Sequence, residues 1–100
     1  MRAVNTILKT AEFDKWLSGL RDMKAKVRIA ARIRNAEAGN FGDCKFFDGI
    51  GEMRVDVGAG YRVYFVRRGE VVYLLLCGGD KSTQDADIKR AKRMVQELEG

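Results

Sequence analysis

Three cationic side chains, Arg54, Arg62 and Lys81, stand on or just after strand-like segments in the second half of the chain. Arg54 and Arg62 flank the turn at residues 58–60, so their segments should pair as a hairpin. If the registers agree in parity, both guanidiniums lie on one face and offer donors to phosphate oxygens. Such cations can stabilise the extra negative charge of a pentacoordinate phosphorane. The spacing fits a cross-strand ion pair of Glu52 with Arg62 equally well.

Lys81 is followed by Ser82, Thr83 and a predicted helix. A helix N-terminus provides N–H donors and a partial positive charge, so an anion site is expected beside Lys81. Capping of the helix explains Ser82 equally well, with Asp85 completing a pair that resembles a capping box. The two glycines at 78–79 resemble a loop that holds phosphate, but the Walker and dinucleotide-binding patterns are both absent from the sequence.

The strand-like segments also carry the tyrosines Tyr61, Tyr64 and Tyr73. Nucleic-acid bases stack on exposed aromatic rings, so these side chains are candidates for RNA contacts. A tyrosine on a strand is more often half-buried in the core, which is the alternative interpretation.

Several common chemistries find no support in the residue types. The chain has no histidine, which removes the commonest general acid or base and the Ser-His and Cys-His nucleophile arrangements. Carboxylates cluster at Asp80, Asp85 and Asp87, which is a weak basis for a metal site, and we predict neither metal nor cofactor. Cys44 and Cys77 lack metal-type spacing and are interpreted as free thiols, with a disulfide between them as the alternative.

The charge of the chain indicates a polyanionic or acidic partner. Nineteen Lys and Arg against fourteen Asp and Glu give a net charge of +5. Lys24, Arg28 and Arg32 follow one another at intervals of four, which places like charges side by side on one face of a predicted helix. This face is either simply solvated or directed toward phosphate or an acidic partner.

The hydrophobic pattern predicts the elements that position these residues. A short strand at 4–8 precedes two helices, capped by Thr10 and Asp22, and the second ends at residues 39–40. The successive turns of its expected stripe are marked by Met23, Val27, Ala30 or Ala31, and Ile33 or Arg34. Four strands, at 44–47, 52–57, 61–67 and 71–77, follow with short turns, and a last helix is expected to begin after Ser82.

This order predicts a single α+β domain over residues 1–100. It consists of an antiparallel sheet of four to five strands, an N-terminal αα-hairpin and a C-terminal helix, in the order β-α-α-β-β-β-β-α. The apolar segment 71–77 should be central and covered on both faces. No segment resembles a signal peptide or a membrane span, so the protein is expected in the cytoplasm.

Four segments carry a family resemblance, and together they cover most of residues 7–92: FDKWLSGL, RIAARIRNAEAGNFGDCK, GIGEMRVDVGAGYRVYF and LLLCGGDKSTQDADIKRA. The chain resembles toxins of the RelE/ParE superfamily, within it the HigB-like addiction-module killer proteins. The resemblance implies a RelE-like fold and a toxin neutralised by a cognate antitoxin, a helix-turn-helix DNA-binding protein. It also implies that mRNA is cut on the ribosome through the 2′-hydroxyl of the RNA, without a metal.

The resemblance gives roles to particular residues. Arg62 matches a position that binds phosphate and stabilises the transition state, and Arg54 and Lys81 match basic positions beside it. RNA contacts are expected from Arg28, Arg32, Tyr64, Ser82 and Thr83.

The chain also departs from the family pattern. Asp87 and Ile88 stand where the nucleases often have a tyrosine or histidine, and their lysine-rich strand is replaced by residues 52–56. Two interpretations follow. In the first, Glu52 acts as the general base beside Lys81 or Arg62. In the second, cleavage of RNA is weak or absent and the protein instead inhibits DNA gyrase, as ParE-type toxins do.

Overall fold

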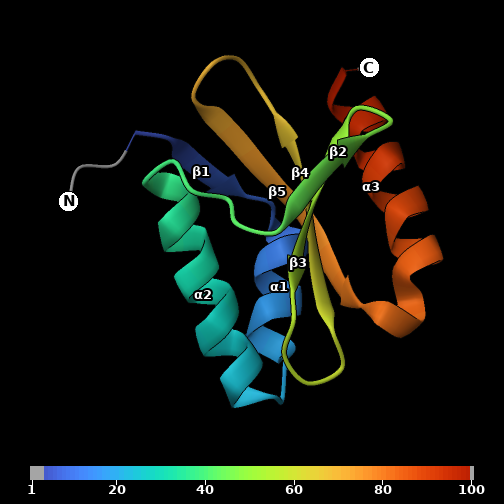
Figure 1. Ribbon diagram of the computed structural model, residues 1–100. Helices are drawn as coiled ribbons and strands as arrows, with labels where there is room; N and C mark the ends of the chain where they lie inside the picture. The colour runs from blue at the N-terminus through green and yellow to red at the C-terminus, as the bar shows by residue number, and fades with distance from the viewer. Residues whose placement is uncertain (1–3, 100) are drawn as a thin grey trace.

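The computed structural model describes residues 4–99 and has an α+β fold (Figure 1). The order of elements follows the predicted one, with a short 3-10 helix added before the last helix. Its elements are β1 (Thr6–Lys9), α1 (Ala11–Gly19), α2 (Met23–Glu37), β2 (Cys44–Phe47), β3 (Ile50–Val55), β4 (Tyr61–Arg67), β5 (Val72–Asp80), the 3-10 helix η1 (Lys81–Thr83) and α3 (Gln84–Glu99).

The five strands form one mixed sheet in the order β1-β5-β4-β3-β2. Strands β2 to β5 are antiparallel neighbours, as their short connections require. The expectation of a wholly antiparallel sheet is wrong at β1, which pairs in parallel with β5 from Thr6 opposite Val72 onward. Hydrophobic alternation predicts that a segment is a strand but contains no information on the direction of a distant partner.

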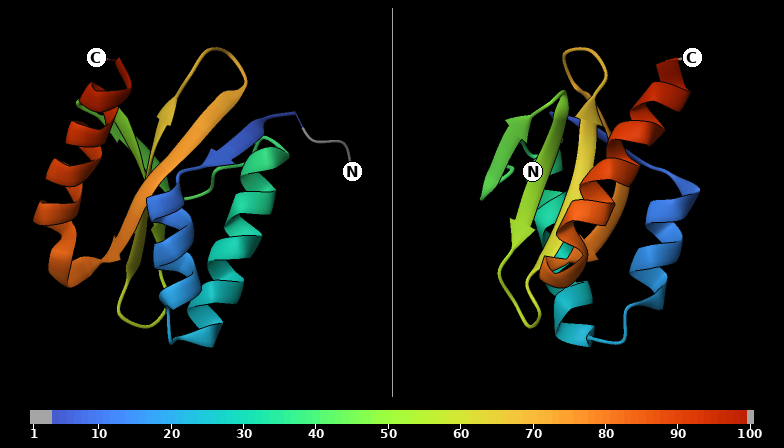
Figure 2. Two further views of the ribbon diagram at one scale, coloured as in Figure 1. Left: turned by 180° about the vertical axis from the view of Figure 1, so that it is seen from behind. Right: turned by 90° about the vertical axis from the view of Figure 1, so that its right-hand side faces the viewer.

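The helices cover both faces of the sheet (Figure 2). One core lies between the sheet and the pair α1 and α2, and includes Phe13, Ile29 and Phe65. The other lies under α3 and includes Tyr64 and Ala91. Strand β5 contacts α1 on one face and α3 on the other, which confirms its predicted central position.

Helices α1 and α2 begin where their predicted capping residues place them. The Thr10 hydroxyl accepts the Phe13 N–H at 3.0 Å, and the Asp22 carboxylate accepts the Ala25 N–H at 3.1 Å. The predicted stripe of α2 is largely wrong, because Met23 and Val27 are exposed. The helix instead buries Ala25, Ile29, Ile33 and Ala36.

Strand β5 continues through Gly78 and Gly79 to Asp80, so these glycines are not a phosphate-binding loop. A Cβ atom on Gly78 would overlap the Trp16 ring, and one on Gly79 would overlap the Asp87 carboxylate. The glycines therefore allow α1 and α3 to approach the strand closely, one on each face.

A β-bulge interrupts the pairing of β5 with β4. Tyr64 is opposite Cys77 while the next residue, Phe65, is opposite Leu75, so Leu76 is the extra residue. Leu76 and Cys77 consequently both belong to the core under α3.

The two cysteines are free thiols within the described part of the chain. Cys44 is partly buried and Cys77 is buried. Burial raises the pKa of the Cys77 thiol to about 12, so it stays protonated at neutral pH.

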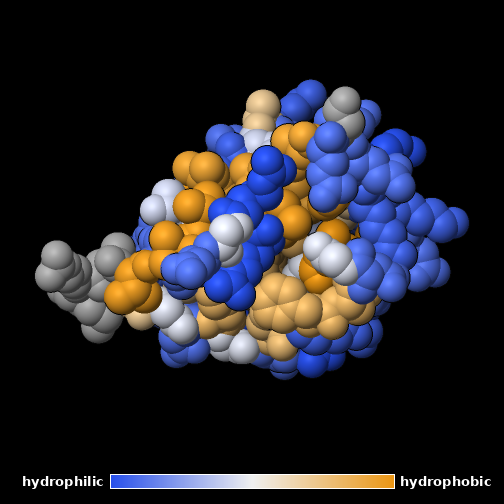
Figure 3. Space-filling view, turned by 90° about the horizontal axis from the view of Figure 1, so that it is seen from above, coloured by the Kyte–Doolittle hydropathy of each residue, from blue (hydrophilic) through white to orange (hydrophobic). Residues whose placement is uncertain are grey.

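The surface carries exposed apolar side chains between hydrophilic ones, as Figure 3 shows for the end of the molecule with the β4–β5 turn. In the described part of the chain, none of the helices combines the length and apolarity needed to cross a bilayer. The large apolar side chains with the greatest exposed fractions are Val27, Met23, Phe46, Val4, Leu8, Val71 and Leu98.

Candidate functional site

The β3–β4 hairpin places Arg54 directly opposite Arg62, so the condition that the two registers agree in parity is met. Both lie on the sheet face that carries α3, because Tyr64, two residues along β4, packs in the core under that helix. Strand β5 lies beside β4, with Gly79 opposite Arg62, and Lys81 follows directly after its end. Antiparallel pairing therefore gathers the three predicted cations at one end of the sheet.

These cations share a pocket of about 270 Å³. Lys81 is exposed and takes part in no salt bridge among residues 4–99. Two carboxylates also reach the pocket, so it combines acceptors with an excess of donors. Its lining residues are Asp43, Arg54, Val55, Asp56, Gly60, Tyr61, Arg62 and Lys81.

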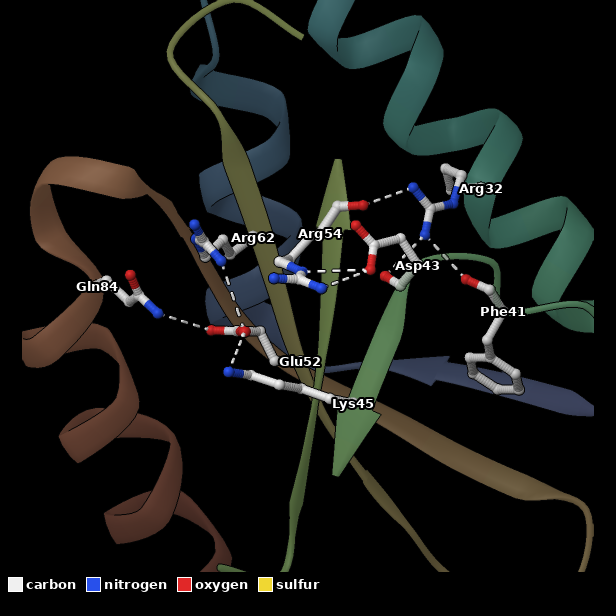
Figure 4. A network of polar contacts seen from close by, with 8 residues as sticks. All are labelled: Arg32, Phe41, Asp43, Lys45, Glu52, Arg54, Arg62 and Gln84. Atoms are coloured by element: carbon white, nitrogen blue, oxygen red, sulfur yellow. Dashed lines mark hydrogen bonds and ion pairs between the residues drawn. The ribbon is translucent and has the colours of Figure 1, made fainter. Parts of the chain in front are cut away.

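Glu52 does not line the pocket but contacts Arg62, which does, and its side chain is 0% exposed (Figure 4). Its Oε1 is 3.5 Å from Arg62 Nη1 and 3.8 Å from Lys45 Nζ, and its Oε2 accepts a hydrogen bond of 3.2 Å from Gln84. The cross-strand pair of Glu52 with Arg62, which was the alternative interpretation of this spacing, is therefore present. The Glu52 carboxylate is buried and contacted by Arg62, Lys45 and Gln84, so it cannot reach a substrate. Its expected role as general base therefore finds no support.

Tyr64, one of the residues expected to contact RNA, is fully buried beside Glu52. Its ring has no exposed face on which a base could stack. Burial, together with the negative charge of Glu52, raises the pKa of the Tyr64 hydroxyl well above its ordinary value of 10. Tyr64 is thus a core residue whose hydroxyl group stays protonated.

Arg54 is held at the rim of the pocket by Asp43. Its Nη2 and Nε donate to Asp43 Oδ1 at 2.8 and 3.2 Å, and these bonds raise the pKa of the guanidinium. The side chain is nevertheless 44% exposed, so donors remain available to a ligand.

Arg32, expected to bind RNA, instead supports the backbone beside the pocket (Figure 4). Its guanidinium donates to the carbonyl oxygens of Arg54 at 2.6 Å, Phe41 at 2.9 Å and Asp43 at 3.2 Å. The basic face of α2 is thereby divided: Arg32 is structural, while Arg28 is exposed and lines a different groove.

Asp80, and not Ser82, caps the turn after β5. Its Oδ1 accepts the Ser82 N–H at 2.8 Å and the Ser82 hydroxyl at 2.5 Å, while the Thr83 hydroxyl donates to Asp87 at 2.5 Å. The predicted anion site at this helix start is therefore occupied by the chain's own carboxylate. The expected RNA contacts of Ser82 and Thr83 would have to break these bonds.

Substitution of Asp80 by alanine is expected to lower the free energy of unfolding by about 1 kcal/mol at pH 7, the usual cost of a lost cap. The hydrogen bonds from Ser82 lower the pKa of Asp80 below its ordinary value of 3.8. The native carboxylate thus contributes its charge-dependent stability above pH 3.8 and loses it as the pH falls through the lowered pKa. Urea unfolding of the variant and the wild type between pH 2 and 7 measures this, with Glu70→Ala, which removes an exposed carboxylate from the β4–β5 turn, as the control. A difference that does not change with pH would contradict the assignment.

Three further residues complete the site, and no pattern in the sequence pointed to their roles. Gln84 and Lys45 hold Glu52 from other elements, and Asp43 orients Arg54. Buried Asp87 anchors α3, and its i,i+3 spacing from Arg90, with which it forms an ion pair, is a local signal for this role. Across residues 4–99, no three or more His, Cys, Asp or Glu side chains come together as metal ligands would.

Comparison with known proteins gives one close relative. No family model matches the chain. An uncharacterized protein of Haemophilus influenzae (strain ATCC 51907 / DSM 11121 / KW20 / Rd) is 56% identical over 93 residues, which cover 92% of this chain and 94% of the relative. Such identity over nearly the whole of both chains means that the protein belongs to the same family as this Haemophilus influenzae protein.

Proposed function

We propose that the protein is the toxin of a type II toxin–antitoxin system, a HigB-like member of the RelE/ParE superfamily that cleaves mRNA on the ribosome. The observation that carries the proposal is the meeting of Arg54, Arg62 and Lys81 in one pocket. Cations arranged in this way bind phosphate oxygens through charge-assisted hydrogen bonds. The order of elements, β-α-α-β-β-β-β-α, supports the same family.

The reaction we propose uses the RNA as its own nucleophile. The 2′-hydroxyl oxygen gives up its proton and forms a bond to the neighbouring phosphorus while the bond from phosphorus to the 5′-oxygen breaks. The departing 5′-oxygen takes up a proton from water, which leaves a 2′,3′-cyclic phosphate and a 5′-hydroxyl. Arg62 and Lys81 stabilise the negative charge of the pentacoordinate intermediate. The ribosome supplies much of the positioning of the RNA, which lowers the demands on the toxin's own residues.

A proton acceptor for the 2′-hydroxyl is available in the pocket wall. Asp43 is committed to Arg54, whereas Asp56 is exposed and makes no salt bridge or side-chain hydrogen bond among residues 4–99. We therefore assign the role of general base to Asp56 in place of buried Glu52.

Lys81→Ala is the cleanest test of this function, because the side chain is exposed and its removal breaks no salt bridge in residues 4–99. Expression of the wild-type chain should arrest growth and leave cut messages. Removal of one stabilising donor should slow cleavage by about 10²–10³-fold. Lys89→Ala, which removes an exposed lysine from α3 outside the pocket, is the matched control and should cut at the wild-type rate. Intact messages during growth arrest would contradict the proposal.

One observation favours a second candidate function, inhibition of DNA gyrase without RNA cleavage. Glu52, the residue expected to act as general base, is buried. Asp87, which stands where the nucleases often have a tyrosine or histidine, is bound to Thr83 and Arg90. On this alternative the purified protein inhibits supercoiling, and messages in arrested cells stay intact.

A further inference from the structure

The outer face of α2 combines exposed apolar and cationic side chains. Met23 and Val27 are 65% and 66% exposed, although both are large apolar residues. Together with Val57, which follows β3, and the exposed cations Lys24 and Arg28, they line a groove of about 400 Å³. We refer to these five residues as the α2 groove.

The exposed apolar side chains and the neighbouring cations of the α2 groove both raise the free energy of the isolated chain. Apolar surface grouped in this way costs free energy in water and is typical of interaction sites. Lys24 and Arg28 are separated by one helical turn, where like charges repel, and neither has a salt bridge within the part of the chain that the structure covers. A partner that is both apolar and acidic would remove both costs.

We propose that the α2 groove binds an amphipathic, acidic helix of a partner protein. Apolar side chains of the partner helix would fill the space between Met23, Val27 and Val57, and its carboxylates would face Lys24 and Arg28. Binding of one helical face in a groove is a common mode of peptide recognition, and opposite charges at the rim determine orientation and specificity. The proposal does not depend on what the pocket of Arg54, Arg62 and Lys81 does.

Other occupants fit the α2 groove less well. A second copy of the chain would bring cations of the same sign together across a symmetric interface. RNA would satisfy Lys24 and Arg28 but would leave Met23, Val27 and Val57 against phosphate and sugar, and the groove has no aromatic ring among its five lining residues.

The α2 groove lies beside the proposed phosphate pocket. Val57 is the neighbour of Asp56 in the pocket wall. Asp22, which caps α2, accepts a hydrogen bond of 3.4 Å from the Tyr61 hydroxyl, another pocket residue. A helix bound in the groove would therefore sit at the edge of the pocket.

A labelled synthetic helix of about 18 residues, or five turns, tests the proposal, with leucines on one face and glutamates flanking them. We expect saturable binding, measured by fluorescence anisotropy, that Val27→Glu and Arg28→Glu each weaken at least about tenfold. Two control variants, Lys89→Glu with the same charge change and Leu98→Glu on α3, should bind like the wild type. A peptide of identical composition with its leucines scattered around the helix should not bind.

Several outcomes would overturn the proposal. The first is that the peptide does not bind, and the second is that the peptide with scattered leucines binds equally well. The third is that Lys89→Glu lowers the affinity for the peptide as much as Arg28→Glu does, because this would indicate unspecific charge attraction. Binding of an RNA oligonucleotide that depends on Arg28 and displaces the peptide would assign the groove to RNA. Self-association in sedimentation that Val27→Glu abolishes would assign it to a second copy. The Lys81→Ala assay of RNA cleavage is independent of all these results.

Discussion

Arg62→Ala is expected to lower the free energy of unfolding by about 3–5 kcal/mol, the usual cost of removing one partner of a buried ion pair. Glu52 is 0% exposed and the Arg62 side chain 13% exposed, so the remaining carboxylate cannot be solvated in place of its lost partner. Lys45 is farther away, at 3.8 Å, and is 53% exposed, so it compensates only weakly. Urea unfolding of the two proteins measures the loss.

A double-mutant cycle separates the buried charge from other effects of the substitution. Glu52→Gln keeps the shape of residue 52 and removes its charge, so Arg62→Ala combined with Glu52→Gln should recover most of the lost stability. Arg54→Ala is the matched control: its pair with Asp43 is exposed, so its loss should lower the stability much less than Arg62→Ala does. Equal losses in the single and double variants would contradict a buried ion pair as the cause.

The cycle also determines how activity data for Arg62 can be interpreted. Loss of toxicity in Arg62→Ala alone is compatible with simple unfolding. The double variant lacks the same cation but should be folded, so loss of RNA cleavage in it would report on the role of Arg62 at phosphate.

Gly79→Ala is expected to destabilise the protein by about 1–3 kcal/mol through overpacking. The added Cβ atom would lie 2.7 Å from Asp87 Cγ and 2.9 Å from Thr83 Oγ1, and it would overlap the Asp87 carboxylate. Asp87 is itself buried and fixed by Thr83 and Arg90, so it cannot move aside without breaking those bonds. Relief would require α3 to shift away from β5.

Thermal or urea unfolding of Gly79→Ala measures this effect, and Gly19→Ala provides the control. A Cβ atom on Gly19, the last residue of α1, would meet no atom within 4 Å in the described structure, so no loss is expected. Unchanged stability of Gly79→Ala would mean that α3 is not held against the strand as described.

The parts of the fold that sequence reasoning predicted correctly are determined by neighbouring residues. Thr10 and Asp22 cap helices through bonds to residues three positions later. Short turns force β2 to β5 to be antiparallel, and the same turns bring Arg54, Arg62 and Lys81 together. The parallel pairing of β1 with β5 joins distant segments, and no local pattern could indicate it.

The features of the site that were not predicted also depend on contacts between distant residues. Gln84 reaches Glu52 across 32 positions, and Arg32 binds carbonyl oxygens, which are present in every residue and leave no mark in the sequence. In α2 two apolar series run at helical spacing, and the sequence does not show that the one with Ile29 and Ile33 faces the sheet while Met23 and Val27 face water. Burial is a property of the assembled layers.

The bulge in β5 interrupts the alternation of side chains between the two faces of the sheet. Before it Leu75 faces α1 and α2, and after it Gly78 does, three positions later instead of two. Because Leu76 is the unpaired extra residue, its loss would restore strict alternation and leave Cys77, Gly78 and Gly79 opposite the same residues of β4. The bulge therefore lets β5 place two successive side chains, Leu76 and Cys77, under α3 while the strand stays in register with β4 on both sides of it. The position of Lys81 at the end of the strand depends on that register and not on the extra residue.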